Sequence, residues 1–263
     1  MMLFFIGQIF PYLSAGIFLV GMIWRVWIWF RVPVPFQLTL SPAPTTTKGR
    51  VLTIGKELLL FRNLWRSDRF LWLWAWLMHV TLGMVIVGHV VGISSLGLQF
   101  TPLGITATQS KGLSTILATS TGMLLLAALV MLLYRRIVIW EVKRLSNPIE
   151  YFDLLLILAV VISGLYMRVI LSEMDLVVIR IYMEGILSFQ SSPIPHDWTF
   201  IGHFFLANTL LIYIPFSKLV HFVGGVVNQS MMVAAVPVYP SPHKSNPDTT
   251  SAKVSLWEGR DLQ

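Results

Sequence analysis

Long apolar segments alternate with short polar ones along most of the chain. A helix needs about 20 apolar residues to cross a hydrocarbon core of about 30 Å. Five segments reach that length: residues 3–30, 70–93, 113–134, 151–171 and 199–223. A sixth apolar stretch, residues 174–189, is interrupted by Asp175, Arg180 and Glu184. This pattern is typical of a helix that lies at the membrane interface rather than across the membrane.

We therefore expect an all-α integral membrane protein with a five-transmembrane-helix bundle over residues 1–233. The first segment lacks a basic leader and a small-residue cleavage site, so it is expected to be a retained helix. Pro215 lies inside the fifth segment, where a proline is expected to kink the helix. Residues 234–263 are rich in Pro, Ser, Asp and Lys, and are expected to be a cytoplasmic tail that docks on a partner.

Basic residues set the expected orientation, because Lys and Arg collect in cytoplasmic loops. The connection between the first and second segments contains seven of them, and the connection between the third and fourth contains four. The loop between the second and third segments has only Lys111, and the chain before the first segment has none. We expect the N-terminus outside and the C-terminus in the cytoplasm, with the protein in the cell membrane.

The composition restricts both the class of protein and the cofactors that the chain can bind. Charged residues make up 12% of the chain, against about 25% in soluble domains. The net charge of +7 does not indicate nucleic-acid binding. The basic residues flank the apolar segments, as they do in proteins that span a lipid bilayer. The chain has no cysteine, which excludes thiolate-bound iron–sulfur clusters and thioether-attached haem within it. Any iron–sulfur chemistry must come from a partner.

Four histidines lie inside the predicted spans, where polar side chains are costly and usually functional. His79 and His89 lie in the second segment, and His203 and His221 in the fifth. Antiparallel segments pair His89 with His203 near the outside and His79 with His221 near the cytoplasm. Eighteen residues are five helical turns, which would place His203 and His221 on one face of a continuous helix. Two such pairs are candidate axial ligands of two haem irons.

A ligand imidazole is neutral, and its second ring nitrogen needs a hydrogen-bond acceptor. Backbone carbonyls one turn away, Thr81 or Asn208 are the expected acceptors. Small residues near the histidines leave room for a flat macrocycle, or else they allow close helix packing: Gly83, Gly88, Gly92, Gly202 and Ala207. His196 precedes Asp197 in a helix-start context and is expected at the outer interface. His243 is expected to be a solvated tail residue.

Two motifs resemble the gamma subunit of respiratory nitrate reductase. They are H-x9-H-x-x-G, formed by His79, His89 and Gly92, and P-F-S-K-L-V-H, which ends an H-x17-H spacing at His221. The long first connection, the acidic outer helix and the extended tail are more similar to the membrane cytochrome b of the dissimilatory sulfite reductase-linked redox complex. This resemblance implies a cytochrome with two haem b groups that acts as an electron-transfer subunit of an oxidoreductase complex.

The same resemblance implies electron exchange between a (mena)quinone pool and a cytoplasmic iron–sulfur subunit related to heterodisulfide reductase, in respiratory sulfur metabolism. Further membrane and extracytoplasmic redox subunits are implied. It also implies a quinone site at the outer haem, beside Gly92 and Lys111, with His196 or Asp197 relaying protons. The alternative that Lys111 only extends to the outer membrane interface stays open. The expected partners of the inner haem propionates are arginines at helix ends: Arg69, Arg135 and Arg136.

Two other interpretations stay open. The chain could serve a nitrate reductase or another quinone-linked oxidoreductase, with the same haems and a different partner. It could also be a transporter or a structural membrane anchor whose histidines carry protons. Transporters commonly contain paired repeats, and this sequence shows no internal repeat.

Overall fold

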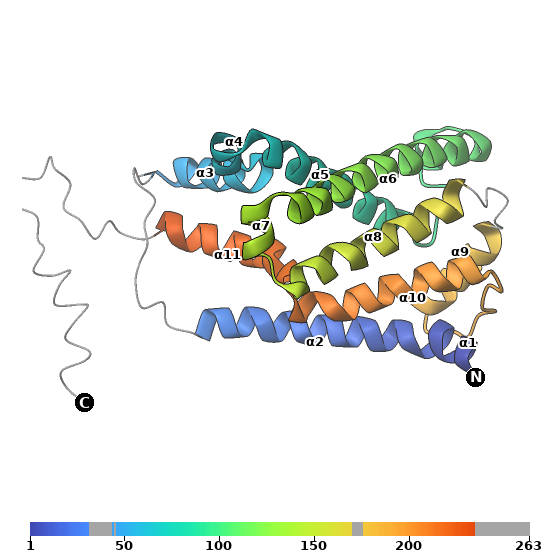
Figure 1. Ribbon diagram of the computed structural model, residues 1–263. Helices are drawn as coiled ribbons and strands as arrows, with labels where there is room; N and C mark the ends of the chain where they lie inside the picture. The colour runs from blue at the N-terminus through green and yellow to red at the C-terminus, as the bar shows by residue number, and fades with distance from the viewer. Residues whose placement is uncertain (32–43, 45, 170–175, 235–263) are drawn as a thin grey trace, which may run out of the picture. The chain divides into compact units, whose positions relative to one another are not determined.

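A computed structural model of the chain describes residues 1–31, 44, 46–169 and 176–234 (Figure 1). These residues form helices and turns, with no strand among them, so the prediction of an all-α protein is confirmed. The chain divides into two compact units: unit 1 comprises Met1–Arg25 and Leu64–Val220, and unit 2 comprises Val26–Asn63 and His221–Gln263. Most of the predicted tail, with His243, lies outside the described residues.

Five helices within the described ranges are long and apolar enough to cross a membrane, as predicted. The first, Met2–Arg31, joins α1 (Met2–Phe4), the π-helical η1 (Phe5–Ile9) and α2 (Phe10–Arg31). The others are α5 (Arg69–Gly92), α6 (Ala107–Val138), α8 (Pro148–Val169), and α10 (Trp198–Tyr213) with the 3-10 helix η3 (Ile214–Phe216). The chain is a multi-pass membrane protein.

Two of these helices begin at identifiable caps. The Asp68 carboxylate accepts from the Leu71 N–H at 2.8 Å and starts α5. At α6, Thr106 and Gln109 form a capping box, so this helix begins at Ala107 rather than at residue 113. The cap therefore brings Lys111 into the first turns of α6.

Shorter helices complete the described chain: α3 (Thr47–Leu60), α4 (Arg62–Ser67), η2 (Thr101–Leu103), α7 (Trp140–Leu145), α9 (Leu176–Leu187), η4 (Lys218–Val220) and α11 (His221–Ala234). The α9 helix has 12 residues and is not among the membrane-length helices. The interfacial position expected for this acidic apolar stretch stays a prediction. In unit 2, α11 packs on α3, with Gly225 of α11 beside Leu58 of α3.

The prediction of one continuous helix over residues 199–223 is wrong. The α10 helix ends at Tyr213, and α11 begins only at His221. Pro215 has no N–H for the helical hydrogen bond, and its ring clashes with the preceding turn. The chain then becomes extended at Ser217, with φ −109° and ψ 176°. His203 and His221 thus lie on separate helices in separate units, and the five-turn argument for a shared face does not apply.

The core of unit 1 forms where α8 lies between α6 and α10 (Figure 1). Leu125 and Leu129 of α6 and Ile157 of α8 are buried together. At Gly122 of α6, a Cβ atom would lie 2.7 Å from a methyl carbon of Leu165, so the two helices approach closely there. Close packing of this kind, rather than exclusion of water, holds membrane helices together.

One end of unit 1, here called the Gly92 end, contains the last turn of α5, the first turns of α6 and α10, the end of α8, and α9. Tyr182 of α9 is fully buried, and its hydroxyl donates to the Gly7 carbonyl at 2.5 Å. Burial raises the pKa of the Tyr182 phenol well above its ordinary range, with a further contribution from Tyr12. Arg180 of α9 donates to the Leu96 carbonyl at 2.6 Å, which ties the α5–α6 loop to α9.

The opposite end of unit 1, here called the Asp68 end, is joined by ion pairs. Arg135 of α6 contacts Asp68 at 2.7 Å. Glu150 of α8 pairs with Arg136 of α6 and, at 2.5 Å, with Lys218 of η4. These contacts link the cap of α5 with α6, α8 and η4 at the Asp68 end.

Candidate functional site

The imidazole rings of His89 and His203 face each other at the Gly92 end of unit 1. Their ring centroids are 6.3 Å apart, and their planes are inclined by 32°. Two imidazole nitrogens bound at about 2 Å to one iron place the ring centres roughly 6 Å apart. The two side chains, from α5 and α10, therefore lie at the separation that a shared iron requires.

Hydrogen bonds set the protonation of the two α5 histidines. The Nδ1 atom of His89 lies 2.7 Å from the Val85 carbonyl, and that of His79 lies 2.7 Å from the Ala75 carbonyl. A carbonyl oxygen only accepts, so each Nδ1 carries the proton and each Nε2 carries the lone pair. A neutral imidazole with its Nδ1–H donated is the usual form of a metal ligand.

The acceptors on α5 are backbone carbonyls one turn before each histidine, one of the alternatives expected from the sequence. Neither side-chain alternative is the Nδ1 partner of His79 or His89, and both groups have hydrogen bonds elsewhere. Thr81 donates to the Leu77 carbonyl at 2.7 Å. Asn208 is buried, accepts from Ser14 of α2 and donates to the Phe204 carbonyl.

His203 has a side-chain partner that the sequence did not single out. Ser163 of α8 donates its hydroxyl proton to the Val160 carbonyl at 2.9 Å, so its oxygen accepts from His203 Nδ1–H, also at 2.9 Å. The lone pair of His203 is then on Nε2, as in His89. Three histidines of unit 1 thus share one tautomer.

The backbone of α8 lies close to the His203 ring at Gly164. A Cβ atom on Gly164 would lie 3.0 Å from Cε1 of His203, tighter than ordinary van der Waals contact. By contrast, Cβ atoms on Gly83, Gly88 and Gly202 would meet no other atom within 4 Å. These three glycines thus have open space beside them, and the two facing neutral imidazoles are a donor set that fits a haem.

The two histidines of the predicted inner pair belong to different units. His79 is half-buried in α5 of unit 1, and His221 is the first residue of α11 in unit 2. Their pairing stays a prediction. Within the described part of the chain, no three His, Cys, Asp or Glu side chains converge on a metal-binding point. Two-histidine coordination needs no third side chain, because a macrocycle supplies the other four nitrogens.

Two residues of the predicted quinone site lie at the Gly92 end with His89. Gly92 is buried, and a Cβ atom there would meet the Gln99 amide at 2.7 Å. Lys111 is exposed, with Cγ 3.9 Å from the Cβ position of Gly97. Gly97 has φ +83°, a conformation that glycine adopts without strain. The α5–α6 loop therefore turns sharply beside the stem of Lys111.

The third residue, His196, is exposed in the segment before α10. Asp197 caps α10, as its helix-start context predicted, and accepts from the N–H groups of Thr199 and Phe200. Hydrogen bonds, first from the Thr199 hydroxyl, hold the pKa of Asp197 below its ordinary value. An ionised, capping Asp197 is a poorer proton relay than His196, which is outside the helix.

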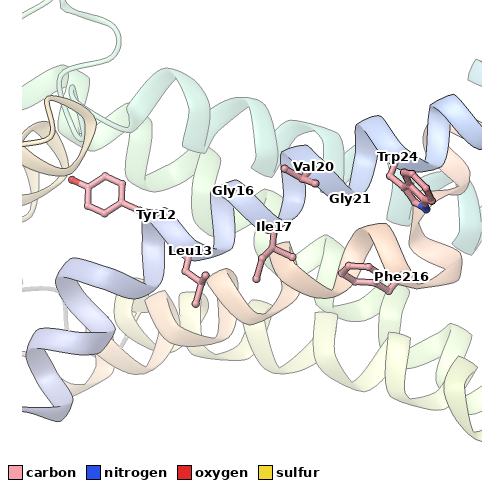
Figure 2. A pocket seen from close by; sticks show the side chains of 8 residues that line it. All are labelled: Tyr12, Leu13, Gly16, Ile17, Val20, Gly21, Trp24 and Phe216. Atoms are coloured by element: carbon pink, nitrogen blue, oxygen red, sulfur yellow. The ribbon is translucent and has the colours of Figure 1, made fainter.

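Unit 1 also has an apolar groove, with a volume of about 540 Å³, along α2 between Tyr12 and Trp24 (Figure 2). Phe216 of η3 closes its side, and Gly16 and Gly21 form part of its floor. No histidine lines it. The groove is therefore separate from the imidazole pair.

The arginines expected at the inner propionates have other partners. Arg135 and Arg136 form ion pairs with Asp68 and Glu150, and the Arg69 guanidinium stacks on the Trp65 ring. Sequence reasoning missed Ser163 and Gly164. The available signal was a polar residue next to a glycine within an apolar span, a pattern that close packing produces equally well.

The fold and the site together define an α-helical, multi-pass membrane protein with histidines facing one another between two of its helices. The nitrate reductase gamma subunit family matches residues 46–233, most of the chain. The chain belongs to this family, and the resemblance inferred from the two histidine motifs is confirmed.

Two archaeal relatives are similar over most of their length. One, from Archaeoglobus fulgidus, is 28% identical over 97% of this chain and 84% of its own. The other, from Archaeoglobus profundus, is 26% identical over 81% of this chain and 74% of its own. Both are named "Hdr-like menaquinol oxidoreductase cytochrome b-like subunit". These names match the narrower resemblance to a redox-complex membrane cytochrome.

Proposed function

We propose that this protein is a dihaem b-type cytochrome subunit that exchanges electrons between a menaquinone pool and a partner redox subunit. The facing His89–His203 pair, with a centroid distance of 6.3 Å, is the observation that carries the proposal. Both rings have Nδ1 hydrogen-bonded, which leaves Nε2 as the donor toward a common iron. Haem iron, when bound, supplies one-electron chemistry that no side chain of this protein can perform.

We propose His89 and His203 as ligands of the haem at the Gly92 end, the outer haem, and His79 and His221 as ligands of the inner haem. The outward direction of the Gly92 end rests on the Lys and Arg counts of the connections. In the cell membrane, this orientation places the Asp68 end in the cytoplasm, toward a soluble partner.

The quinone site is proposed at the Gly92 end, beside the outer haem. Lys111 donates to a quinone carbonyl and stabilises the charge that develops there. Gly92 allows the ring to approach α5, and His196 accepts the proton released toward the exterior. The family match and the relatives' name, which includes a menaquinol oxidoreductase, support this assignment.

The proposed partner is a cytoplasmic iron–sulfur subunit resembling heterodisulfide reductase, in a complex of respiratory sulfur metabolism with further membrane and extracytoplasmic redox subunits. The relatives' designation as subunits of an Hdr-like oxidoreductase supports a multi-subunit complex. The absence of cysteine in the sequence also supports it, because electrons must leave the chain for clusters held elsewhere.

Purification of the full chain from membranes of a haem-competent host tests the proposal. We expect a reduced-minus-oxidised b-type spectrum, two haems per chain, and reduction by a menaquinol analogue. The His89→Ala variant should retain one haem and lose reduction by the quinol, whereas His243→Ala should retain both. A wild-type protein with no haem, or with one haem per chain, would contradict the dihaem assignment.

A further inference from the structure

Arg168 lies at the Gly92 end of α8, one helical turn beyond the glycine that packs on the His203 ring. Residues four apart share a helix face, so Arg168 and Gly164 lie one above the other. The Arg168 Nη2 donates to Ser114 of α6 at 3.1 Å. Its Nε atom is buried and has no hydrogen-bond partner. This buried Nε–H donor is therefore unsatisfied within the described part of the chain.

Two arginines at the opposite end of unit 1 are neutralised by ion pairs. Arg135 pairs with Asp68, and Arg136 with Glu150. Among the described residues, no Asp or Glu forms an ion pair with Arg168, whose single hydrogen bond is to the neutral Ser114. A charged group at membrane depth is costly unless an anion or a polar group compensates it. The arrangement indicates an anion that the described residues do not supply.

We propose that Arg168 anchors a propionate carboxylate of the outer haem, an assignment that rests on the proposed function. The planar guanidinium presents parallel N–H groups that match a carboxylate. Arg168 lies one turn, about 5.4 Å along α8, from Gly164, whose backbone approaches His203. Ser114 holds Nη2, which leaves Nε for the carboxylate. Arg168 is thus a positioning residue that also keeps a positive charge beside the outer haem.

Removal of that charge should favour the oxidised haem. In purified Arg168→Gln, we expect the outer haem's midpoint potential to fall by an amount equivalent to roughly tenfold in its redox equilibrium, ~59 mV for one electron. Arg168→Lys, which keeps the charge and loses the fork, should shift the potential much less. Spectroelectrochemical titration gives both values, and the loss of one component in His89→Ala identifies the outer haem.

Arg180→Gln is the matched control, because it removes the same charge at the same end from a guanidinium that a loop carbonyl already holds. We expect a clearly smaller shift in this variant. An outer potential in Arg168→Gln that equals that of the wild type would overturn the proposal. Weaker quinone-analogue binding with an unchanged potential would also overturn it and would assign Arg168 to the quinone.

A misfolded Arg168→Gln variant can be recognised because it should lose both haems. If Arg168→Gln loses both haems, the comparison passes to Arg168→Lys. A small fall in the outer potential of that variant, with the inner potential constant, supports the anchor, and an outer potential equal to that of the wild type refutes it. A wild-type protein without haem would refute the proposed function, whereas a haem-loaded protein that is insensitive to residue 168 would refute only the anchor.

Discussion

Hydrogen bonds to the second ring nitrogen tie each histidine of unit 1 to its surroundings. His79 and His89 donate to carbonyls of their own helix, whereas His203 donates to Ser163 of a neighbouring helix. An intrahelical bond orients the ring relative to its own backbone alone. The bond to Ser163 also couples the orientation of His203 to the packing of α8 against α10.

Ser163→Ala should raise the outer haem's midpoint potential and weaken haem retention, by about 10–100-fold in affinity. The hydrogen bond makes the His203 imidazole more basic, which stabilises the oxidised iron, and the alanine removes this effect. Potentiometric titration and haem loss on dilution in detergent provide the measurements. Ser120→Ala, at an exposed serine bonded only within α6, should change neither. Equal effects of the two variants would mean that the bond to Ser163 has no influence on the ligand.

At the scale of the elements, α8 carries both the contacts to His203 and the proposed propionate anchor, Arg168. Its Leu156 and Ile157 are buried in the core, Ser163 and Gly164 contact His203, and Arg168 reaches Ser114 of α6. Because these residues lie on one rigid helix, a change in α8 packing displaces the contacts to His203 together.

Gly164→Ala should lower the content of outer haem while the inner haem stays. The new methyl carbon would lie 3.0 Å from the His203 ring and push it aside. Alanine favours a helix over glycine by up to about 1 kcal/mol, so helix propensity cannot explain a loss. Gly112→Ala, in open space on α6, gains the same propensity and should keep both haems. Haem quantification per chain distinguishes the two variants, and a normal outer haem in Gly164→Ala would contradict the close approach.

Asp68 should make the stability of the α5–α6 contact dependent on pH. The Leu71 N–H, and then the pairing with Arg135, lower the pKa of Asp68 below its ordinary value of 3.8, against an opposing effect of desolvation. A carboxylate with a depressed pKa stabilises the fold fully above its unfolded pKa. That contribution is lost as the pH falls through the folded value. The stabilisation should therefore be complete at neutral pH and disappear below about pH 4.

Two variants separate the cap from the ion pair at pH 7. Asp68→Asn keeps the cap and loses the ion pair with Arg135, which should lower the free energy of unfolding by less than about 1 kcal/mol. Asp68→Ala loses both, which should cost about 1–2 kcal/mol. Melting temperatures in detergent between pH 7 and pH 3.5 give the comparison. Both variants should lose only the part of the acid dependence that Asp68 contributes, because Asp197 also has a lowered pKa. Identical melting of the two at pH 7 would show that the cap contributes nothing.

At the scale of the whole molecule, redox chemistry of the proposed kind requires subunits other than this chain. The sequence has no cysteine for a cluster. The proposed orientation would place the ion-paired Asp68 end toward the proposed cytoplasmic partner. The predicted docking tail, residues 234–263, lies almost wholly outside the described residues. Its role is open to a direct experiment.

Deletion of residues 235–263 should leave two haems per chain and abolish co-purification of the iron–sulfur partner. The membrane helices and all four candidate ligands lie before the deletion, so haem binding has no reason to change. Affinity purification from the native host, followed by mass spectrometry and haem quantification, measures both outcomes. Retention of the partner at the wild-type level would refute the docking role of the tail.

Much of this protein follows from the sequence alone. Apolar segments of membrane length predicted the five helices, because only a continuous helix satisfies backbone hydrogen bonds in a bilayer. The histidine motifs predicted the family, and the α9 stretch was predicted not to span because charges interrupt its apolar run. These features depend on local composition and spacing, which a sequence displays directly.

Only the tertiary structure decided the rest. Pro215 divides the fifth segment into α10 and α11, and whether a proline kinks or ends a helix depends on its neighbours. The Ser163 acceptor, the close approach of Gly164 and the unsatisfied Arg168 all involve residues far from His203 in sequence or on another helix. Contacts between helices depend on their rotation and depth. Periodicity leaves both undetermined until the side chains pack.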